Sequence, residues 1–245
     1  MKFVVVANNP LPYHTPILNA LADRVDLHVI YMSSHHPLGS FLDPWGADPR
    51  FSYSFHPGAR LGIPRFDLRL QVSLGVSRAI SRHRPDALLV SSWGPLTWEP
   101  LAWARAHQCA GLIWAESTSW SGLFRGRLSE ALRRRVVGTA SGFVANGTAA
   151  RNYVIELGAP SERVVTSCLP SAIFSPRHPS PARSGPPRFL FVGRLIASKQ
   201  PVELIGAFRR VLDQVPDATL TIVGAGAEGE RAELAARSLG ASVRF

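Results

Sequence analysis

The chain has 245 residues, 46% of them hydrophobic and 18% charged, with a formal net charge of +10. This composition is ordinary for a soluble protein with a buried core, and its apolar runs are of strand length, far below the ~20 residues that span a bilayer. The positive charge does not indicate a nucleic-acid-binding protein, because the arginines are scattered and their one run, Arg133–Arg135, has no interleaved aromatic residues.

Residues 1–174 alternate short apolar strands with amphipathic helices. The longest predicted helix, 68–83, rests on a stripe formed by Leu68, Val72, Val76 and Ile80. Strands that are apolar almost throughout, with helices between them, predict a parallel sheet buried on both faces. The strands are predicted at residues 2–7, 25–31, 87–91, 111–115, 142–145 and 164–167, and the helices at 16–22, 68–83, 101–107, 128–137 and 149–157.

Two segments interrupt this alternation. Residues 32–67 show little periodicity, and residues 116–126 follow a predicted strand. Because ligands bind at the carboxyl ends of parallel strands, we expect both segments to lie at that edge of the sheet and to border one cleft with Asn9 and His14. The turn Asn146-Gly147-Thr148 reads only as a connection from a strand to a helix.

A change of composition separates this first domain from a second one. Residues 175–187 contain five prolines, which neither a helix nor a central strand accommodates, so they are predicted to be a linker. The alternation restarts at 188–245. Its strands are predicted at 189–192, 218–223 and 242–245 and its helices at 202–211 and 228–238. These elements are too few to cover both faces of a sheet, so we expect the second domain to be incomplete.

The first strand of the second domain leads into a basic turn. Gly193 and Arg194 follow the strand, and Lys199 comes five residues later, where the next helix begins. The amide groups and dipole of a helix N-terminus attract anions, and a guanidinium with an ammonium adds charge suited to a diphosphate. The alternative is an ordinary solvent-facing turn. Lys199 is one of only two lysines beside 25 arginines, a bias that indicates a GC-rich bacterial genome.

A glycine-rich turn follows the next strand. Residues 224–229 contain the pattern Gly-x-Gly-x-x-Gly between a strand and a helix, which allows the backbone to approach a ligand closely. A dinucleotide site would also need a carboxylate about twenty residues further on, and the motif would belong on the first strand of its domain. Neither condition is met, which disfavours binding of NAD or FAD.

These residues resemble the start of the C-terminal domain of the retaining family-4 glycosyltransferases, which have the α/β GT-B fold with two Rossmann-like domains. The matching segments are 192–195 with Lys199, 204–208, 216–226 and 239–245. The resemblance implies that Arg194 and Lys199 bind the donor diphosphate and that Gly193, Gly224 and Gly226 lie beside the donor. Gln200 stands where the family usually has a glycine.

The family also carries two glutamates separated by seven residues, which hold the nucleoside and the sugar of the donor. Eight residues after Glu203 and Glu228 stand Val211 and Ala236, so no such pair is present. The resemblance therefore implies that the pair lay beyond Phe245. We expect this chain by itself not to be a competent enzyme.

The first half resembles the family's N-terminal domain more loosely, through residues 10–14, 16–21, 114–118 and 153–159. The family's usual glycine pair after the first strand is replaced by His14-Thr15, which weakens the case for a donor phosphate there. The resemblance makes Asn9, His14, Trp93 and Glu116 candidates for acceptor binding. The alternatives are that His14 caps a helix, Trp93 belongs to the core and Glu116 pairs with an arginine.

The resemblance implies transfer of a sugar from a nucleotide diphosphate sugar to an acceptor, with retention and without a metal or other cofactor. The acceptor is a sugar, a lipid-linked molecule or another compound; neither the donor sugar nor the base is specified. A fragment or pseudoenzyme that binds a partner or nucleotide, and an NAD(P)-dependent oxidoreductase, remain alternatives. The N-terminus lacks the blocks of a signal peptide, so a cytoplasmic location is expected. The Arg133–Arg135 run is a solvated face or, alternatively, contacts anionic membrane lipid.

Overall fold

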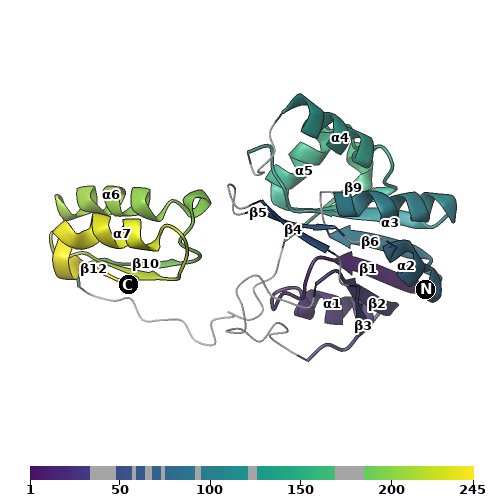
Figure 1. Cartoon of the computed structure of the whole chain (residues 1–245), viewed down its shortest axis with the longest axis horizontal. Coiled ribbons are helices and arrows are strands. Elements are labelled where there is room, and N and C mark those ends of the chain that lie inside the picture. The colour runs from purple at the N-terminus through teal and green to yellow at the C-terminus, as the bar shows by residue number, and fades with distance from the viewer. Residues whose placement is uncertain are drawn as a thin grey trace. The chain divides into compact units, whose positions relative to one another are not determined.

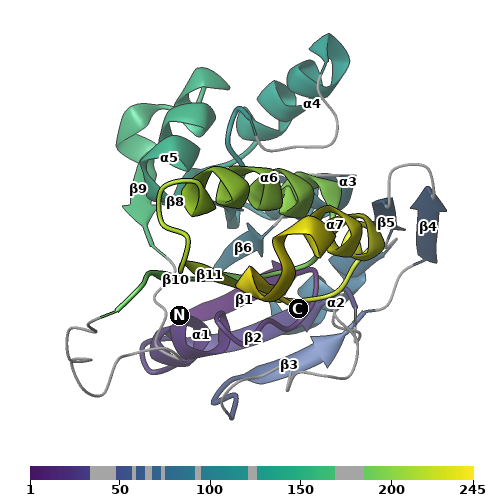
Figure 2. The same cartoon turned by 90° about the vertical axis from the view of Figure 1, so that its left-hand side faces the viewer.

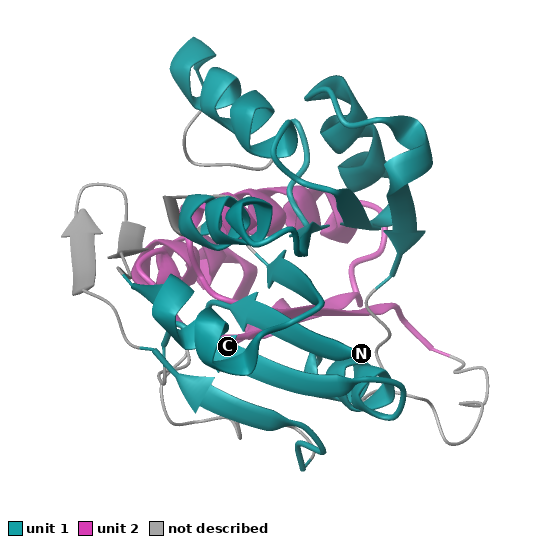
Figure 3. Cartoon of the chain, turned by 90° about the vertical axis from the view of Figure 1, so that its right-hand side faces the viewer, with its two compact units in different colours: residues 1–176 teal, residues 177–245 magenta. Residues whose placement is uncertain are grey.

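The computed structural model describes residues 1–33, 48–56, 59–63, 68–72, 75–91, 95–120, 126–168 and 185–245. The chain divides into two compact units, residues 1–176 and residues 177–245, which Figure 3 colours separately. The limits predicted for the linker, 175 and 187, stay a prediction, since the structure describes this segment only from residue 185 onward.

Unit 1 is built on a seven-stranded sheet in which every neighbouring pair of strands is parallel (Figure 1). The strand order is β3-β2-β1-β6-β7-β8-β9. The chain therefore builds outward from β1 in both directions, and the carboxyl ends of β1 and β6 flank the switch point where such folds bind ligands. The strands are β1 (Lys2–Ala7), β2 (Asp26–Tyr31), β3 (Ser52–Phe55), β6 (Ala87–Ser91), β7 (Ala110–Ala115), β8 (Gly142–Asn146) and β9 (Val164–Ser167).

Helices cover both faces of this sheet (Figure 1). Alternate residues of β1 enter different cores: Val5 packs with Leu18 of α1 (Thr15–Ala22), whereas Val4 and Val6 share a core with residues of the other helices. These are α2 (Val76–His83), α3 (Pro95–Ala106), α4 (Arg127–Val137) and α5 (Gly147–Glu156), and a short 3-10 turn, η3 (Ser161–Arg163), precedes β9. Burial on both faces explains why these strands read as continuous apolar runs.

The predicted helix at 68–83 is wrong in its first half. Residues 68–72 form β5 (Leu68–Val72), paired antiparallel with β4 (Ala59–Ile63), and only 76–83 are helical. The apolar residues of this segment satisfy both periods, because Leu68, Leu70 and Val72 also alternate as a strand does. Gly75, at φ 84°, separates the two elements in the left-handed region that glycine tolerates. Within the segment 32–67, Ser52–Phe55 form the edge strand β3, so that part is no loop at the carboxyl edge.

Unit 2 is a smaller parallel sheet with helices on one face (Figure 2). Its strands are β10 (Arg188–Val192), β11 (Thr219–Val223) and β12 (Val243–Arg244), in that order, and the third strand was predicted. Phe208 of α6 (Pro201–Leu212) and Ala232 of α7 (Gly229–Ala236) pack on Leu220 and Ile222, whereas Leu190 and Val192 are 68% and 70% exposed. Two 3-10 turns, η5 (Ala197–Lys199) and η6 (Arg237–Ser242), complete the unit. No helix of the described residues is long and apolar enough to cross a membrane.

Candidate functional site

Polar and aromatic side chains gather in unit 1 where three parallel strands end. The loop after β1 carries Tyr13 and His14, β7 continues into Glu116, and β8 ends at Asn146. The register pairs Ala115 with Ala145, so Glu116 and Asn146 are the next residues along their strands. The sequence separates these groups by up to about 130 residues, and the parallel sheet brings them to one edge.

His14 lies at the centre of an aromatic stack. Its ring is stacked on the Trp114 indole, with centroids 4.8 Å apart, and Tyr13 meets it edge-on at 4.7 Å. The ring is buried, and its Nε2 lies 3.5 Å from Glu116 Oε1 without making a hydrogen bond to any described group. His14 also occupies the N-cap position of α1, but its side chain makes no capping bond. The buried ring therefore lies next to the Glu116 carboxylate without bonding it.

Asn146 connects the Trp114 indole with the Glu116 carboxylate. Its Oδ1 accepts a hydrogen bond from Trp114 Nε1 at 2.9 Å, and its Nδ2 donates one to Glu116 Oε1 at 3.1 Å. Trp114 is buried, so its indole N–H needs this partner. The Glu116 side chain is 47% exposed. The network thus holds one accessible carboxylate in place.

The carboxylate also acts on Tyr13. Burial of the phenol and then the negative charge of Glu116 raise the pKa of Tyr13 above its usual range. The phenol therefore stays protonated at neutral pH and presents a hydrogen-bond donor beside an acceptor.

The structure brings together only some of the four predicted acceptor residues. Glu116 and His14 come together, and Asn9, in the same loop as His14, donates a hydrogen bond from Nδ2 to the carbonyl of Pro10. Trp93 lies outside the described residues. Tyr13, Trp114 and Asn146 were not predicted as site residues, although the position of Asn146 at the end of a strand could have indicated it. The functional roles of all these residues stay predictions.

The glycines of unit 2 allow two loops to pack backbone against backbone. A Cβ on Gly224 (φ +156°) would lie 1.9 Å from the Gly193 carbonyl oxygen, and one on Gly226 (φ +158°) would lie 2.3 Å from that of Leu195. Leu195 N–H donates to the Ala225 carbonyl at 2.9 Å, which ties the loops together. The Gly-x-Gly-x-x-Gly pattern thus has a packing role that needs no bound dinucleotide.

Arg194 and Lys199 occupy the segment between β10 and α6. Both side chains are exposed, and neither pairs with a carboxylate of another described residue. No side chain caps α6, whose N-cap Gln200 is left-handed at φ 53° and whose first residue is Pro201. Lys199 thus lies two residues before the start of α6, and Arg194 stands in the turn that follows β10. A cation close to a helix N-terminus, with a second one in the preceding turn, is an arrangement that can attract anions.

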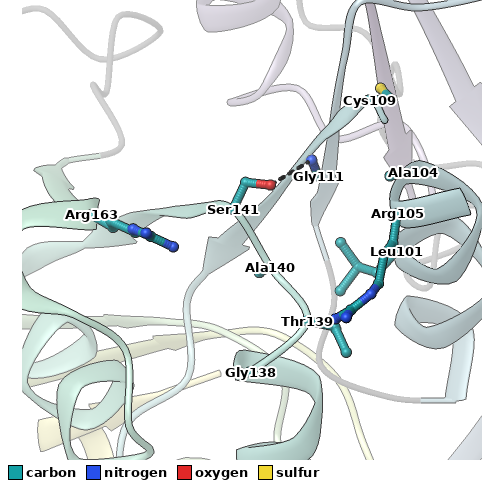
Figure 4. Close-up of a pocket in the computed structure, with 10 residues that line it drawn as sticks. All are labelled: Leu101, Ala104, Arg105, Cys109, Gly111, Gly138, Thr139, Ala140, Ser141 and Arg163. Carbon is teal, nitrogen blue, oxygen red and sulfur yellow. Dashed lines mark hydrogen bonds between the residues drawn. The ribbon is translucent and has the colours of Figure 1, made fainter. Parts of the chain in front are cut away.

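A hollow of about 480 Å³ lies at the opposite edge of the unit 1 sheet (Figure 4). Its lining includes Cys109 and Gly111 at the start of β7 and Ser141 just before β8, and Ser141 Oγ accepts a hydrogen bond from Gly111 N–H at 3.3 Å. Arg105 and Arg163, both exposed, also line it. These are the amino ends of the strands, so the hollow is separate from Glu116 and its neighbours.

Comparison with known families gives two matches along the chain. Residues 10–169 match the family described as Glycosyl transferase 4-like domain, and residues 175–245 match the one described as Glycosyl transferases group 1. A search of curated proteins found no match.

Solved structures share the fold over the whole chain at low sequence identity. Crystal structures of HepE from Anabaena in complex with UDP and of the apo lipopolysaccharide outer core galactosyltransferase WaaB match at 15% and 14% identity, with TM-scores of 0.68 and 0.62. UDP-N-acetylglucosamine 2-epimerase of Rickettsia bellii matches at 14% identity and a TM-score of 0.59. Each match covers 100% of this chain and 68% of the other. These likenesses show the fold and confirm the predicted GT-B-like α/β class.

Proposed function

Since the chain belongs to the group 1 glycosyl transferases, with a glycosyl transferase 4-like domain before the group 1 domain, we propose that its two domains serve the transfer of a sugar from a nucleotide diphosphate sugar to an acceptor, with retention at the anomeric carbon. The observation that carries this proposal is that the two matches together span both units. In this proposal, donor binding requires no metal or other cofactor, because cationic side chains of the protein neutralise the diphosphate.

Unit 2 would bind the donor through its diphosphate. Arg194 and Lys199 supply two charges without a carboxylate partner, and the uncapped N-terminus of α6 adds amide dipoles. When the bond to the sugar breaks, negative charge develops on the leaving diphosphate. Cations fixed in advance at that position stabilise the transition state more than the ground state, which lowers the barrier.

The packed glycine loops would set the position of Arg194. The residue lies between Gly193 and Leu195, and the carbonyl groups of both residues approach the opposite loop at Gly224 and Gly226. Such close backbone packing limits the movement of the loop that carries the guanidinium. A cation held in place loses less entropy when it binds a phosphate.

Unit 1 would present the acceptor. The exposed carboxylate of Glu116 accepts a hydrogen bond from an acceptor hydroxyl, and the protonated Tyr13 phenol donates one to an acceptor oxygen. His14 and Asn146 act through Glu116, because the His14 ring nitrogen is buried and Asn146 Nδ2 is bonded to the carboxylate. Such pairing of acceptor and donor groups orients a hydroxyl, which is the main task of an acceptor site.

The identity of the donor can be narrowed for testing. HepE has been solved with UDP, with UDP and glucose, and with UDP-glucose, so uridine diphosphate sugars are the first donors to test. No residue of this chain is assigned to the nucleoside or sugar, because its 245 residues contain no glutamates separated by seven residues.

We further propose a cytoplasmic location and peripheral contact with anionic membrane.

The test is a transfer assay with a panel of nucleotide sugars, including UDP-glucose, and simple sugar acceptors. The product's anomeric configuration is read by proton NMR. A product of unchanged configuration supports the proposal, and an inverted product contradicts retention. If no sugar is transferred or hydrolysed and UDP still binds, the chain binds the nucleotide without catalysing transfer, as the sequence analysis expects of this chain by itself. Binding of NADPH in place of UDP would favour the oxidoreductase alternative.

A further inference from the structure

The outer side of α4 carries leucines that the rest of unit 1 leaves uncovered. Leu128 is 76% exposed, the highest value among large apolar side chains of the described residues, and Leu132 is 48% exposed. The two are four residues apart, so they share one side of the helix. In Figures 1 and 2, α4 stands away from the sheet at the top of unit 1. Neighbouring exposed leucines on one helix indicate a contact surface more strongly than isolated ones.

The same helix is strongly basic. It contains four arginines against the single Glu130. Arg127 is the first residue of α4, where the helix dipole disfavours a cation, so its charge does not stabilise the helix. Its side chain is exposed and pairs with no carboxylate of another described residue.

The side chains of the run Arg133–Arg135 largely make contacts within the protein. Arg133 donates to the Tyr153 hydroxyl at 2.7 Å, Arg134 pairs with Glu130 at 2.7 Å, and Arg135 lies 5.8 Å from the centroid of the Trp98 ring. The contacts of Arg133 and Arg135 attach α4 to α5 and α3, whereas the Arg134–Glu130 pair lies within α4. A membrane contact would therefore depend on Leu128, Leu132 and Arg127 more than on the run that the sequence analysis singled out.

We propose that Leu128, Leu132 and Arg127, the α4 surface, bind the anionic face of a lipid bilayer. The leucines enter the boundary between head groups and acyl chains, and the guanidinium lies at the level of the lipid phosphates. Amphipathic helices with apolar and basic residues bind anionic membranes in this way, and the affinity depends on both terms. A nucleic acid would use the arginine but would have no use for two exposed leucines.

The position of this surface along the chain connects it with the acceptor site, an inference that rests on the proposed function. Glu116 ends β7, and the chain then passes through the exposed Trp120 to α4, only eleven residues after Glu116. Eleven residues of chain span at most about 40 Å, so a membrane that binds α4 lies within that reach of the acceptor carboxylate. The acceptor class that this arrangement favours is a hydroxyl carried on a lipid.

The experiment is co-sedimentation of the chain with vesicles of phosphatidylcholine alone or mixed with phosphatidylglycerol. We expect binding to the anionic vesicles that weakens with added salt. The double variant Leu128→Ser, Leu132→Ser should lower the partition coefficient about tenfold or more, and Arg127→Ala roughly fivefold. Circular dichroism and thermal unfolding should stay unchanged, because the replaced side chains are exposed.

The matched controls replace exposed apolar residues elsewhere. Leu190→Ser with Val192→Ser changes the open sheet face of unit 2, and Leu234→Ser changes an exposed helical leucine of α7. Neither should reduce vesicle binding. Absence of binding by the parent chain, or an equal loss in these controls, would overturn the proposal. The proposal would also be overturned if the parent chain forms a dimer that the Leu128→Ser, Leu132→Ser variant does not form, and if neither protein binds vesicles. The assay contains no nucleotide sugar, so its failure would contradict the proposed membrane contact and leave the proposed donor binding untouched.

Discussion

The side-chain amide of Asn146 donates a hydrogen bond of 3.1 Å to the Glu116 carboxylate and accepts one of 2.9 Å from the Trp114 indole. The two residues lie thirty positions apart and meet because β7 and β8 are parallel neighbours in register. The exposed carboxylate of the proposed acceptor site is thus held by a residue that also satisfies a buried indole. Its position is fixed by the core of unit 1.

Replacing Asn146 should destabilise unit 1 as well as loosen Glu116. In Asn146→Ala the buried Trp114 N–H loses its acceptor, and an unsatisfied buried donor costs about 1–3 kcal/mol of folding free energy. Urea unfolding followed by tryptophan fluorescence measures this loss. Asn152→Ala, at an exposed position of α5, the helix that follows Asn146, should change stability by less than about 0.5 kcal/mol. Equal stability of both variants and the parent would show that the network is unimportant.

The stability of unit 1 should depend on pH through His28. Its ring bonds Ser52 Oγ at 2.8 Å and Ser54 Oγ at 2.9 Å and stacks on His83, with centroids 3.7 Å apart. Burial, and then the neighbouring His83, lower the pKa of His28 from 6.5 to about 4, while Asp26 opposes this shift. The unfolded chain therefore binds the proton more readily. The stabilisation that depends on a neutral His28 is fully present above about pH 6.5 and is lost as the pH falls towards 4.

Thermal unfolding between pH 7.5 and pH 4.5 tests this dependence. The ring is only partly buried, which reduces the effect, and we expect the free energy of unfolding to fall by about 1–2 kcal/mol across this pH range. His28→Gln should flatten the curve, although its stability at pH 7.5 is lower because bonds to the edge strand β3 change. A parallel curve for His28→Gln would disprove the role of His28.

Gln200 should be a site of conformational strain. It stands at φ 53°, in the left-handed region, where the family usually has glycine. Gln200→Gly removes the steric cost of a side chain in this conformation, and we expect it to stabilise unit 2 by about 0.5–1 kcal/mol. Gln200→Ala keeps a Cβ and should give no gain. A destabilised glycine variant would mean that the Gln200 side chain makes contacts that outweigh the strain.

The open face of the unit 2 sheet should promote association. Leu190 and Val192 are largely exposed on β10, and Val223 is exposed on β11. Contiguous apolar surface of this kind drives proteins together at high concentration. Sedimentation velocity at increasing protein concentration should show association that Leu190→Ser with Val192→Ser reduces. The α4 double variant should leave it unchanged; an equal reduction there would assign the association to α4.

Most strands could be predicted because burial on both faces makes them short and continuously apolar, as at 87–91 and 111–115. The edge strand β3 was missed because Ser52–Phe55 is largely exposed and alternates serine with aromatic residues. The helix predicted over 68–83 failed because the spacing of its leucines and valines also fits a strand. In the site, His14 and Glu116 were chosen separately as candidates. Their contact and the bonds of Asn146 depend on strand order and register, which no local pattern contains.

Arg194 and Lys199 were predicted from a local pattern, and their surroundings agree with an anion site. No described carboxylate pairs with them, and Lys199 stands two residues before the start of α6, which no side chain caps. Replacing either one with alanine removes a charge that would be desolvated against a phosphate. This costs about 2 kcal/mol or more, or roughly thirtyfold in the dissociation constant.

The most direct measurement is titration of the chain with UDP by isothermal calorimetry, repeated for Arg194→Ala, Lys199→Ala and the control Arg210→Ala. Arg210 is an exposed arginine in the last turn of α6, at the other end of the helix from the proposed site. We expect the parent and Arg210→Ala to bind UDP alike and the other two variants to bind about thirtyfold more weakly. No binding of UDP by the parent, or equal binding by all four proteins, would contradict a donor diphosphate site at Arg194 and Lys199.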